Sequence, residues 1–179
     1  MNVNEILTKA LSLLGITDLT VAAGNTDPRQ TRLVNALGVA YLELITEYAP
    51  LEKEEDVTVS GGTADLSALS EKLYDVVKLT DEAGEAVQCQ LRGNTLVAKD
   101  GDYRLRYYYL PSSTPAVGGT VETAPQVTLP LFARGVAAEY AFESMLYEEA
   151  LLQERKYKEG LMRVLTPHAA KRITVKRWI

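Results

Sequence analysis

The sequence predicts an α+β fold: a helical bundle with a small antiparallel β-sheet or barrel inserted into it and an extended C-terminal tail. Helical patterns occupy both ends of the chain, at about residues 5–48 and 131–165. Between them lie short segments of alternating apolar pattern, separated by Gly, Asn and Asp turn signals. Because the helices bracket the insertion, we expect them to pack with each other and the β part to project from them.

The N-terminal half holds two predicted helices. The first covers about residues 5–14, with Asn4 as its N-cap and Gly15 as its stop. The second begins at Asp27-Pro28, where Asp is a favourable N-cap and Pro a favourable first residue, and it ends before Pro50.

The middle of the chain changes to short strands. Their predicted positions are residues 56–60, 74–79, 87–91, 95–98 and 103–110. The last of these, YRLRYYYL, carries bulky side chains on both faces, so we expect it to be central or covered on both sides. A loop rich in Pro, Gly, Ser and Thr follows at residues 111–128, and such length is typical of a functional or disordered segment.

The helical pattern returns at residues 131–165, with Pro130 at its start. A change of composition at residues 147–149 predicts two helices or one bent helix. In the second part acidic residues precede basic ones, which suits the helix dipole, and Glu154 and Lys158 form an expected i,i+4 pair.

These elements divide the chain into four segments. They are the N-terminal helices (1–50), the β insertion with its long loop (51–128), the C-terminal helices (129–166) and the extended tail (167–179).

Composition restricts the class of protein. Hydrophobic residues make up 46% and charged residues 24% of the 179, which is ordinary for a soluble globular domain. No apolar run approaches the roughly 20 residues of a membrane span, and the N-terminus lacks the basic start of a secretory signal. The single Cys89 excludes an internal disulfide and fits a reducing cytosol. The net charge of −5 argues against a surface that binds nucleic-acid phosphates throughout.

The sequence contains no phosphate-binding loop, dinucleotide fingerprint, HExxH or EF-hand pattern. The only histidine, His168, has no acid or nucleophile tied to it by a motif, so we interpret it as solvated. Cys89 is interpreted as a buried or half-buried small residue. The carboxylates at 52–56 and 148–149 are interpreted as solvated charge at the ends of elements. We therefore predict no enzyme activity, no cofactor and no metal.

Three consecutive tyrosines, Tyr107 to Tyr109, leave an alternative open. Aromatic strands stack bases in single-strand binders. The chain would then be a stand-alone binding module that uses residues 103–109 of the β insertion as a platform for a ligand or single-stranded nucleic acid. Because the chain is acidic, packing in a core or interface is the stronger interpretation of these rings.

The C-terminal tail differs in charge from the rest of the chain. It is basic and contains no Asp or Glu, and it ends in Trp178 and Ile179. An acidic body with a basic, Trp-ended tail favours docking on a partner, although a disordered terminus is the alternative. The predicted docking residues are Lys171, Arg172, Ile173, Val175, Lys176, Arg177, Trp178 and Ile179.

Three stretches together resemble one protein family. They are NEILTKALSLLGI followed by a helix from Asp27-Pro28, the insertion from VTVSGGTADLSAL to YRLRYYYLP, and TLPLFARGVAAEYAFESMLYEEALLQERKY. Across nearly the whole chain this layout resembles the head–tail adaptor, or connector, proteins of tailed bacteriophages. It is similar also to tail tubular protein A of podophages.

The resemblance implies a structural virion protein at the head–tail junction, made in the host cytoplasm. Such adaptors form a ring, usually of twelve copies, beneath the portal, extend the DNA channel and join the capsid vertex to the tail. The implied partners are the portal protein, a downstream neck or tail protein (a stopper, tail terminator or nozzle), further copies of the chain, and passing double-stranded DNA without sequence-specific binding; no membrane is implied. In this family the tail commonly docks on the portal, and an acidic channel wall would not retain DNA.

Overall fold

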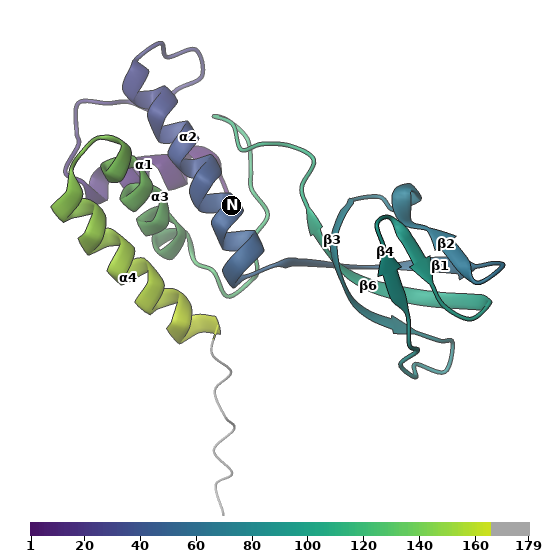
Figure 1. The fold of residues 1–179 in the computed structure, drawn as a ribbon. Helices are drawn as coiled ribbons and strands as arrows, with labels where there is room; N and C mark the ends of the chain where they lie inside the picture. Colours follow the sequence, from purple (N-terminus) through teal and green to yellow (C-terminus); the bar gives the residue numbers. More distant parts are fainter. Residues whose placement is uncertain (166–179) are drawn as a thin grey trace, which may run out of the picture.

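The computed structural model describes residues 1–165 and confirms an α+β fold (Figure 1). It contains four α-helices and two small antiparallel sheets, and no barrel is closed within the described residues. The helices are α1 (Val3–Leu13), α2 (Pro28–Glu43), α3 (Leu129–Glu143) and α4 (Tyr147–Leu165). The strands are β1 (Leu51–Val59), β2 (Thr63–Asp65), β3 (Lys72–Thr80), β4 (Gln90–Arg92), β5 (Thr95–Val97) and β6 (Gly101–Leu110).

Helix α3 lies at the centre of the helical part, and α1, α2 and α4 all pack on it. It is apolar on nearly every side, which is typical of a buried helix. Its fully buried side chains include Phe132, Val136 and Ala137. The two ends of the chain therefore share one core, as the sequence predicts, and no helix in residues 1–165 has the length and apolarity that a membrane span requires.

Helix α2 has the predicted N-cap, whereas helix α1 has a different one. Asp27 caps α2 as predicted, because its carboxylate accepts the Arg29 backbone N–H at 2.8 Å. Helix α1, however, is capped by Asn2, which accepts from the backbone of Asn4 and Glu5. Asn4 was the wrong choice because its own side chain accepts the Gly118 N–H from the distant loop at 2.8 Å.

The C-terminal run forms two helices rather than one bent helix. They are separated at Ser144, Met145 and Leu146, and Met145 has the left-handed φ of 60°. The expected pair within α4 is present, with Lys158 Nζ 2.6 Å from Glu154. Helix α2 continues into one π-helical segment, η1 (Leu44–Tyr48), before Pro50 as predicted.

The strand order is β1-β6-β3 in one sheet and β2-β5-β4 in the other, all antiparallel. Strand β1 begins at Leu51, five residues before the predicted start. The sequence pattern did not indicate this start, because charged residues are not typical of strands. In the structure the outward-facing Glu54 and Asp56 are directly opposite Arg106 and Arg104 of β6. The strand predicted at 87–91 is reduced to the short β4.

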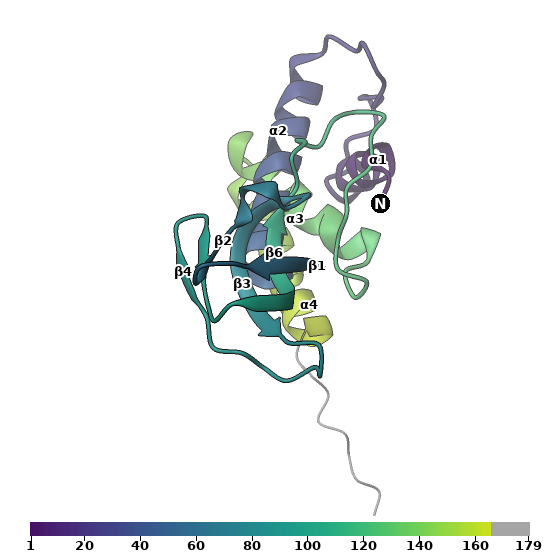
Figure 2. The ribbon, with the colours of Figure 1, turned by 90° about the vertical axis from the view of Figure 1, so that its right-hand side faces the viewer.

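Strand β6 is central, as predicted, but it is covered on one face only. Leu105, Tyr107 and Tyr109 are buried, whereas Arg104 and Arg106 on the other face are exposed. On the exposed face these arginines form ion pairs with carboxylates of β1. The two views of the ribbon show the β part projecting from the helical part (Figures 1 and 2).

Candidate interaction surfaces

The predicted docking residues, from Lys171 to Ile179, lie outside the described residues. His168 lies outside them too. Surfaces that could bind a partner are therefore identified on residues 1–165.

The helical part exposes large apolar side chains. On α2, Val39 is 49% and Leu42 is 54% exposed, and the two share a stripe at i,i+3 spacing. At the turn between α3 and α4 the Phe142 and Tyr147 rings meet edge to face, with centroids 5.6 Å apart, and both are mostly exposed. Apolar side chains gathered on a surface mark an interaction site.

Two adjoining hollows on α3 and α4, which we name the α4 groove, include Phe142 among their lining residues. The smaller, about 190 Å³, lies between α3 and α4. The larger, about 470 Å³, lies along α4, and both include Glu154. The lining residues are Ala138, Glu139, Phe142, Ala150, Glu154, Glu148, Leu151, Leu152, Arg155 and Lys158.

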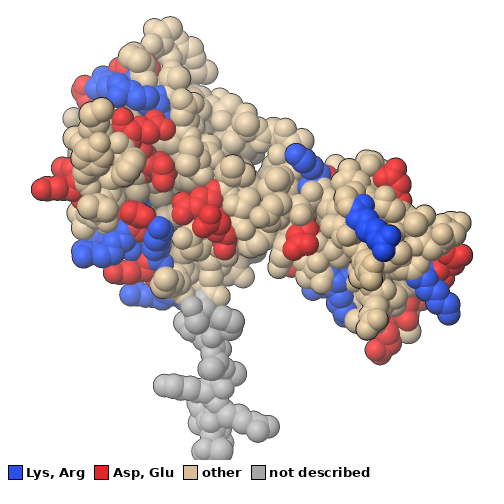
Figure 3. Space-filling view, in the orientation of Figure 1, with Lys and Arg blue, Asp and Glu red and all other residues tan. Residues whose placement is uncertain are grey.

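Carboxylates from three helices lie at this groove or interact electrostatically with it: Glu139 and Glu154 line the groove, and Glu43 of α2 interacts with Glu154 and Lys158. Burial raises the pKa of the Glu43 carboxyl on α2; Lys158 opposes this shift, and Glu47 and Glu154 add to it. Burial also raises the pKa of Glu139 on α3, and the neighbouring carboxylates raise it further. Three carboxylates line the groove against two cations, Arg155 and Lys158, so the groove carries an excess of negative charge. The space-filling view shows acidic side chains interspersed with basic ones on the helical part (Figure 3).

Tyr157 of α4 is a buried side chain that interacts electrostatically with Glu43 and Glu139. Its ring is 1% exposed and meets Tyr48 of η1 edge to face, with centroids 6.4 Å apart. Its hydroxyl is buried and has no hydrogen-bond partner among the described residues. Burial raises the pKa of this hydroxyl, and the fields of Glu43, Tyr48 and Glu139 add to the shift, which places these groups in each other's electrostatic range.

The joint between the helical and β parts is built on Glu122 of the long loop. Its carboxylate accepts the Tyr109 hydroxyl from β6 at 2.8 Å, and its backbone carbonyl accepts the Tyr41 hydroxyl from α2, also at 2.8 Å. One residue earlier, the backbone of Val121 exchanges hydrogen bonds with Met1. The loop predicted to be functional or disordered is thus fixed to both parts of the molecule.

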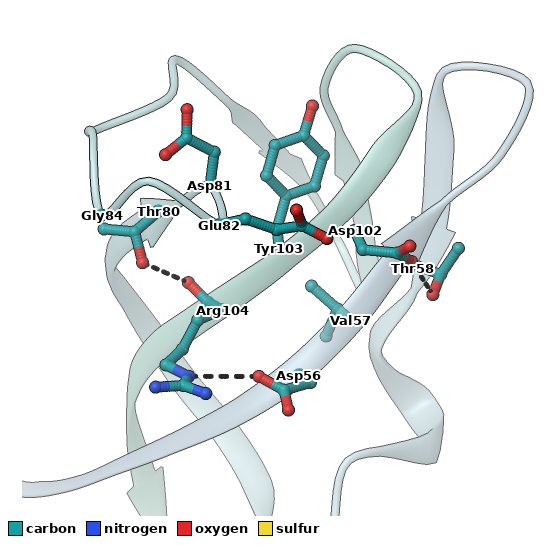
Figure 4. A pocket seen from close by; sticks show the side chains of 10 residues that line it. All are labelled: Asp56, Val57, Thr58, Thr80, Asp81, Glu82, Gly84, Asp102, Tyr103 and Arg104. Carbon is teal, nitrogen blue, oxygen red and sulfur yellow. Dashed lines mark hydrogen bonds and ion pairs between the residues drawn. The ribbon is translucent and has the colours of Figure 1, made fainter.

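A separate hollow of about 460 Å³ lies in the β part (Figure 4). Its carboxylates already have partners: Asp56 pairs with Arg104 at 3.1 Å, and Asp102 accepts the Thr58 hydroxyl at 2.6 Å. Asp81 and Glu82 come from the connection after β3. Residues 1–165 contain no group of His, Cys, Asp or Glu suited to hold a metal ion.

The tyrosines of β6 pack against the protein and do not form an exposed aromatic surface. Tyr107 is fully buried and donates to Glu55 at 2.6 Å, and Tyr109 is 6% exposed. Tyr103 donates to the Lys99 carbonyl at 2.9 Å, and its ring packs close to Gly101. Tyr108 is half-buried. Core packing is thus confirmed for Tyr107 and Tyr109, and these two rings are not available for stacking.

The remaining predicted residues can be placed directly. Cys89 is half-buried, as expected, and precedes β4. Glu148 and Glu149 are exposed in the first turn of α4, as expected. The carboxylates at 52–56 are not at the end of an element, because they lie within β1 and pair across to β6.

Sequence reasoning missed Glu43 and Glu139 as groove residues. They are 96 residues apart and come together only when α2 packs on α3; no local pattern marks either of them. No known family model matches the chain, and no curated protein matches its sequence.

Proposed function

We propose that this chain is a head–tail adaptor of a tailed bacteriophage. It would form a ring, of twelve copies by the family resemblance, beneath the portal, extend the DNA channel and join the capsid vertex to the next neck or tail protein. Its place would be the head–tail junction of the virion, after synthesis in the host cytoplasm.

The observation that carries the proposal is the set of exposed apolar side chains on the helical part. Val39, Leu42, Phe142, Tyr147 and Leu151 are each between 49% and 63% exposed. A chain that works alone rarely leaves so many in water, whereas a subunit of a ring buries such side chains against its neighbours. The projecting β part gives each subunit a second, separate surface for the structure above or below the ring.

The charge of the molecule supports the same proposal. Residues 1–165 hold 24 acidic and 15 basic residues, because four of the 19 Lys and Arg lie in the tail. Such a surface does not retain DNA by phosphate neutralisation. The alternative, a tyrosine platform for single strands, is disfavoured because Tyr107 and Tyr109 are buried.

The test is co-sedimentation with the cognate portal ring, using the intact chain and a chain that ends at Pro167. Binding by the intact chain alone supports the adaptor function and the docking tail. Binding by both supports the adaptor function and excludes the tail as the contact. If neither folded chain binds, the adaptor proposal is wrong.

A second arm tests ring formation itself. Phe142→Ser with Leu151→Ser removes two exposed apolar side chains from the helical part, and we expect assembly on the portal to be lost. The matched control is Val77→Ser with Leu91→Ser, which removes two exposed apolar side chains from the β part. Equal assembly by both double variants would show that the helical surface is not the subunit contact.

A further inference from the structure

The α4 groove has an excess of negative charge within the part of the chain that the structure describes. Lys158 is paired with Glu154 at 2.6 Å, and no described ion pair engages Glu43 or Glu139. Like charges brought together at a partly buried site cost free energy. A basic segment lying in the groove would remove that cost.

The groove is also apolar. Phe142 is 61%, Leu151 63% and Leu152 40% exposed, and all three line it. The smaller hollow is floored by Ala138 and Ala150, whose short side chains leave room for a larger one. The groove therefore fits a segment that combines cations with large apolar side chains.

The sequence supplies such a segment in residues 171–179. KRITVKRWI contains two basic pairs, no acid, and the apolar side chains Ile173, Val175, Trp178 and Ile179. It is basic where residues 1–165 are acidic, and its Trp and Arg are the residue types that contribute most at interfaces.

The length of chain also fits. Helix α4 continues seven residues beyond Lys158 to Leu165, a distance of about 10 Å at the helical rise. Residues 166–171 can span up to roughly 20 Å, and residues 166–178 roughly 43 Å. Returning from Leu165 to Leu151 requires about 21 Å. Both basic pairs can therefore reach the groove of their own molecule.

We propose that the α4 groove binds residues 171–179 of the same molecule. A groove that begins about 10 Å from the point of attachment encounters its own tail at a high effective concentration, because the binding is intramolecular. Glu43, Glu139 and Glu154 pair with the basic side chains, and Trp178 packs beside Phe142 and Leu151. This inference does not depend on the adaptor function. If that function holds, the portal competes with the groove for the tail, and a neighbouring subunit competes with the tail for Phe142 and Leu151.

The experiment uses the only tryptophan of the chain, Trp178, as the probe. Its emission wavelength and its quenching by acrylamide are measured in the intact protein and in a synthetic peptide of residues 166–179. We expect the protein to emit at shorter wavelength and to resist quenching. Raising the salt from about 0.1 M to about 1 M shortens the screening length from about 10 to about 3 Å and should reduce both differences. Emission identical to that of the peptide would overturn the proposal.

Two variants test the groove itself. Glu43→Gln with Glu139→Gln removes one charge that lines the groove and one that interacts with it, without changing side-chain shape, and the emission should move toward that of the peptide. The matched control, Glu82→Gln with Glu85→Gln, removes two exposed charges from the β part and should leave the emission unchanged. Circular dichroism confirms that both variants are folded. A groove variant that retains protected emission would show that the tail binds elsewhere.

A dilution series distinguishes binding of the molecule's own tail from binding of the tail of a second copy. Docking within one molecule is independent of concentration, so emission should stay constant through a dilution series in which light scattering reports a monomer. If the blue shift disappears as an oligomer dissociates, the tail binds a second copy and the proposal as stated is wrong.

Discussion

The phenol end of the Tyr157 ring lies against Gly135, where α4 crosses α3. A Cβ at Gly135 would come within 2.9 Å of Tyr157 Cζ and 3.0 Å of Cε1. The position therefore needs glycine for packing, since an added methyl group would meet a rigid, buried ring. The central crossing of the helical part rests on this contact.

Gly135→Ala is expected to lower the free energy of unfolding by about 1–2 kcal/mol. Overpacking a core costs about 1–3 kcal/mol, and replacing Gly by Ala within a helix returns about 0.5–1 kcal/mol. Urea unfolding at constant slope would measure the change.

The control for that substitution is Gly38→Ala on α2. A Cβ there meets nothing within 4 Å, so this variant should gain about 0.5–1 kcal/mol from helix propensity alone. Gly160→Ala should cost less than Gly135→Ala, because its nearest neighbour is the end of the Leu131 side chain, which can rotate. Stabilisation by Gly135→Ala would show that α4 moves freely relative to α3.

The two hydrogen bonds at Glu122 predict two different coupling energies in double-mutant cycles. Tyr109 donates to the Glu122 carboxylate, whereas Tyr41 donates to its backbone carbonyl. In double-mutant cycles Tyr109→Phe should therefore couple to Glu122→Ala by about 1.5 kcal/mol or more, as expected for a hydrogen bond to a charged group. Tyr41→Phe should show a coupling near zero, since Ala keeps the carbonyl. Equal couplings in urea unfolding would contradict these hydrogen bonds.

Much of the helical architecture can be read from the sequence, because local signals specify it. Asp27-Pro28 starts a helix and Gly15 ends one by their own chemistry. The start of β1 cannot be read in this way. Glu52 and Glu54 are poor strand residues alone and become favourable only when they pair with Arg106, more than fifty residues later.

The groove is hidden from the sequence for a related reason. Glu154 and Lys158 follow a helix-spacing rule and were predicted as a pair. Glu43 and Glu139 obey no such rule, and their altered pKa values arise from burial between helices that meet only in the folded chain. The docking tail was predicted from its composition, but composition alone does not name the surface that receives it.

Lowering the pH should reduce the stability of the β part, because the Glu55 carboxylate becomes protonated. Burial opposes ionisation of this carboxyl, but hydrogen bonds donated by Ser70 and Tyr107 hold its pKa at about 2, below the ordinary 4.5. A depressed folded-state pKa contributes stability that is present above pH 4.5 and is lost as the pH falls toward 2.

Glu55→Gln should therefore lower the free energy of unfolding by about 2 kcal/mol at pH 7, the order of a hydrogen bond to a charged group. The deficit relative to the wild type should shrink between pH 4.5 and about pH 2. Urea unfolding across this range measures it, and Glu54→Gln is the exposed control on the same strand. A deficit that does not change with pH would show that the hydrogen bonds from Ser70 and Tyr107 do not favour the ionised carboxyl.

Neutralising Glu43 and Glu139 should raise the free energy of unfolding when the tail is absent. It should raise it less, or lower it, when the tail is present. The charged groups that line the groove are Glu139, Glu148, Glu154, Arg155 and Lys158. The other titratable groups that interact electrostatically with Glu43 or Glu139 are Glu47, Tyr48, Glu143 and Tyr157. In residues 1–165 the raised pKa values of Glu43 and Glu139 mean that the folded state binds more protons than the unfolded state. Their contribution is favourable below pH 4.5, the ordinary glutamate value, and is lost as the pH rises through the folded pKa.

In a chain that ends at Leu165, Glu43→Gln with Glu139→Gln should therefore raise the free energy of unfolding at pH 7 by up to about 1 kcal/mol, the range of exposed charge pairs. Below pH 4.5 the gain should vanish, because the wild-type carboxyls are then protonated. In the intact chain the same substitutions should give a smaller gain or a loss, since the basic tail already neutralises these carboxylates. Urea unfolding of the four proteins measures the difference. An equal gain with and without the tail would show that residues 171–179 do not lie on Glu43 and Glu139.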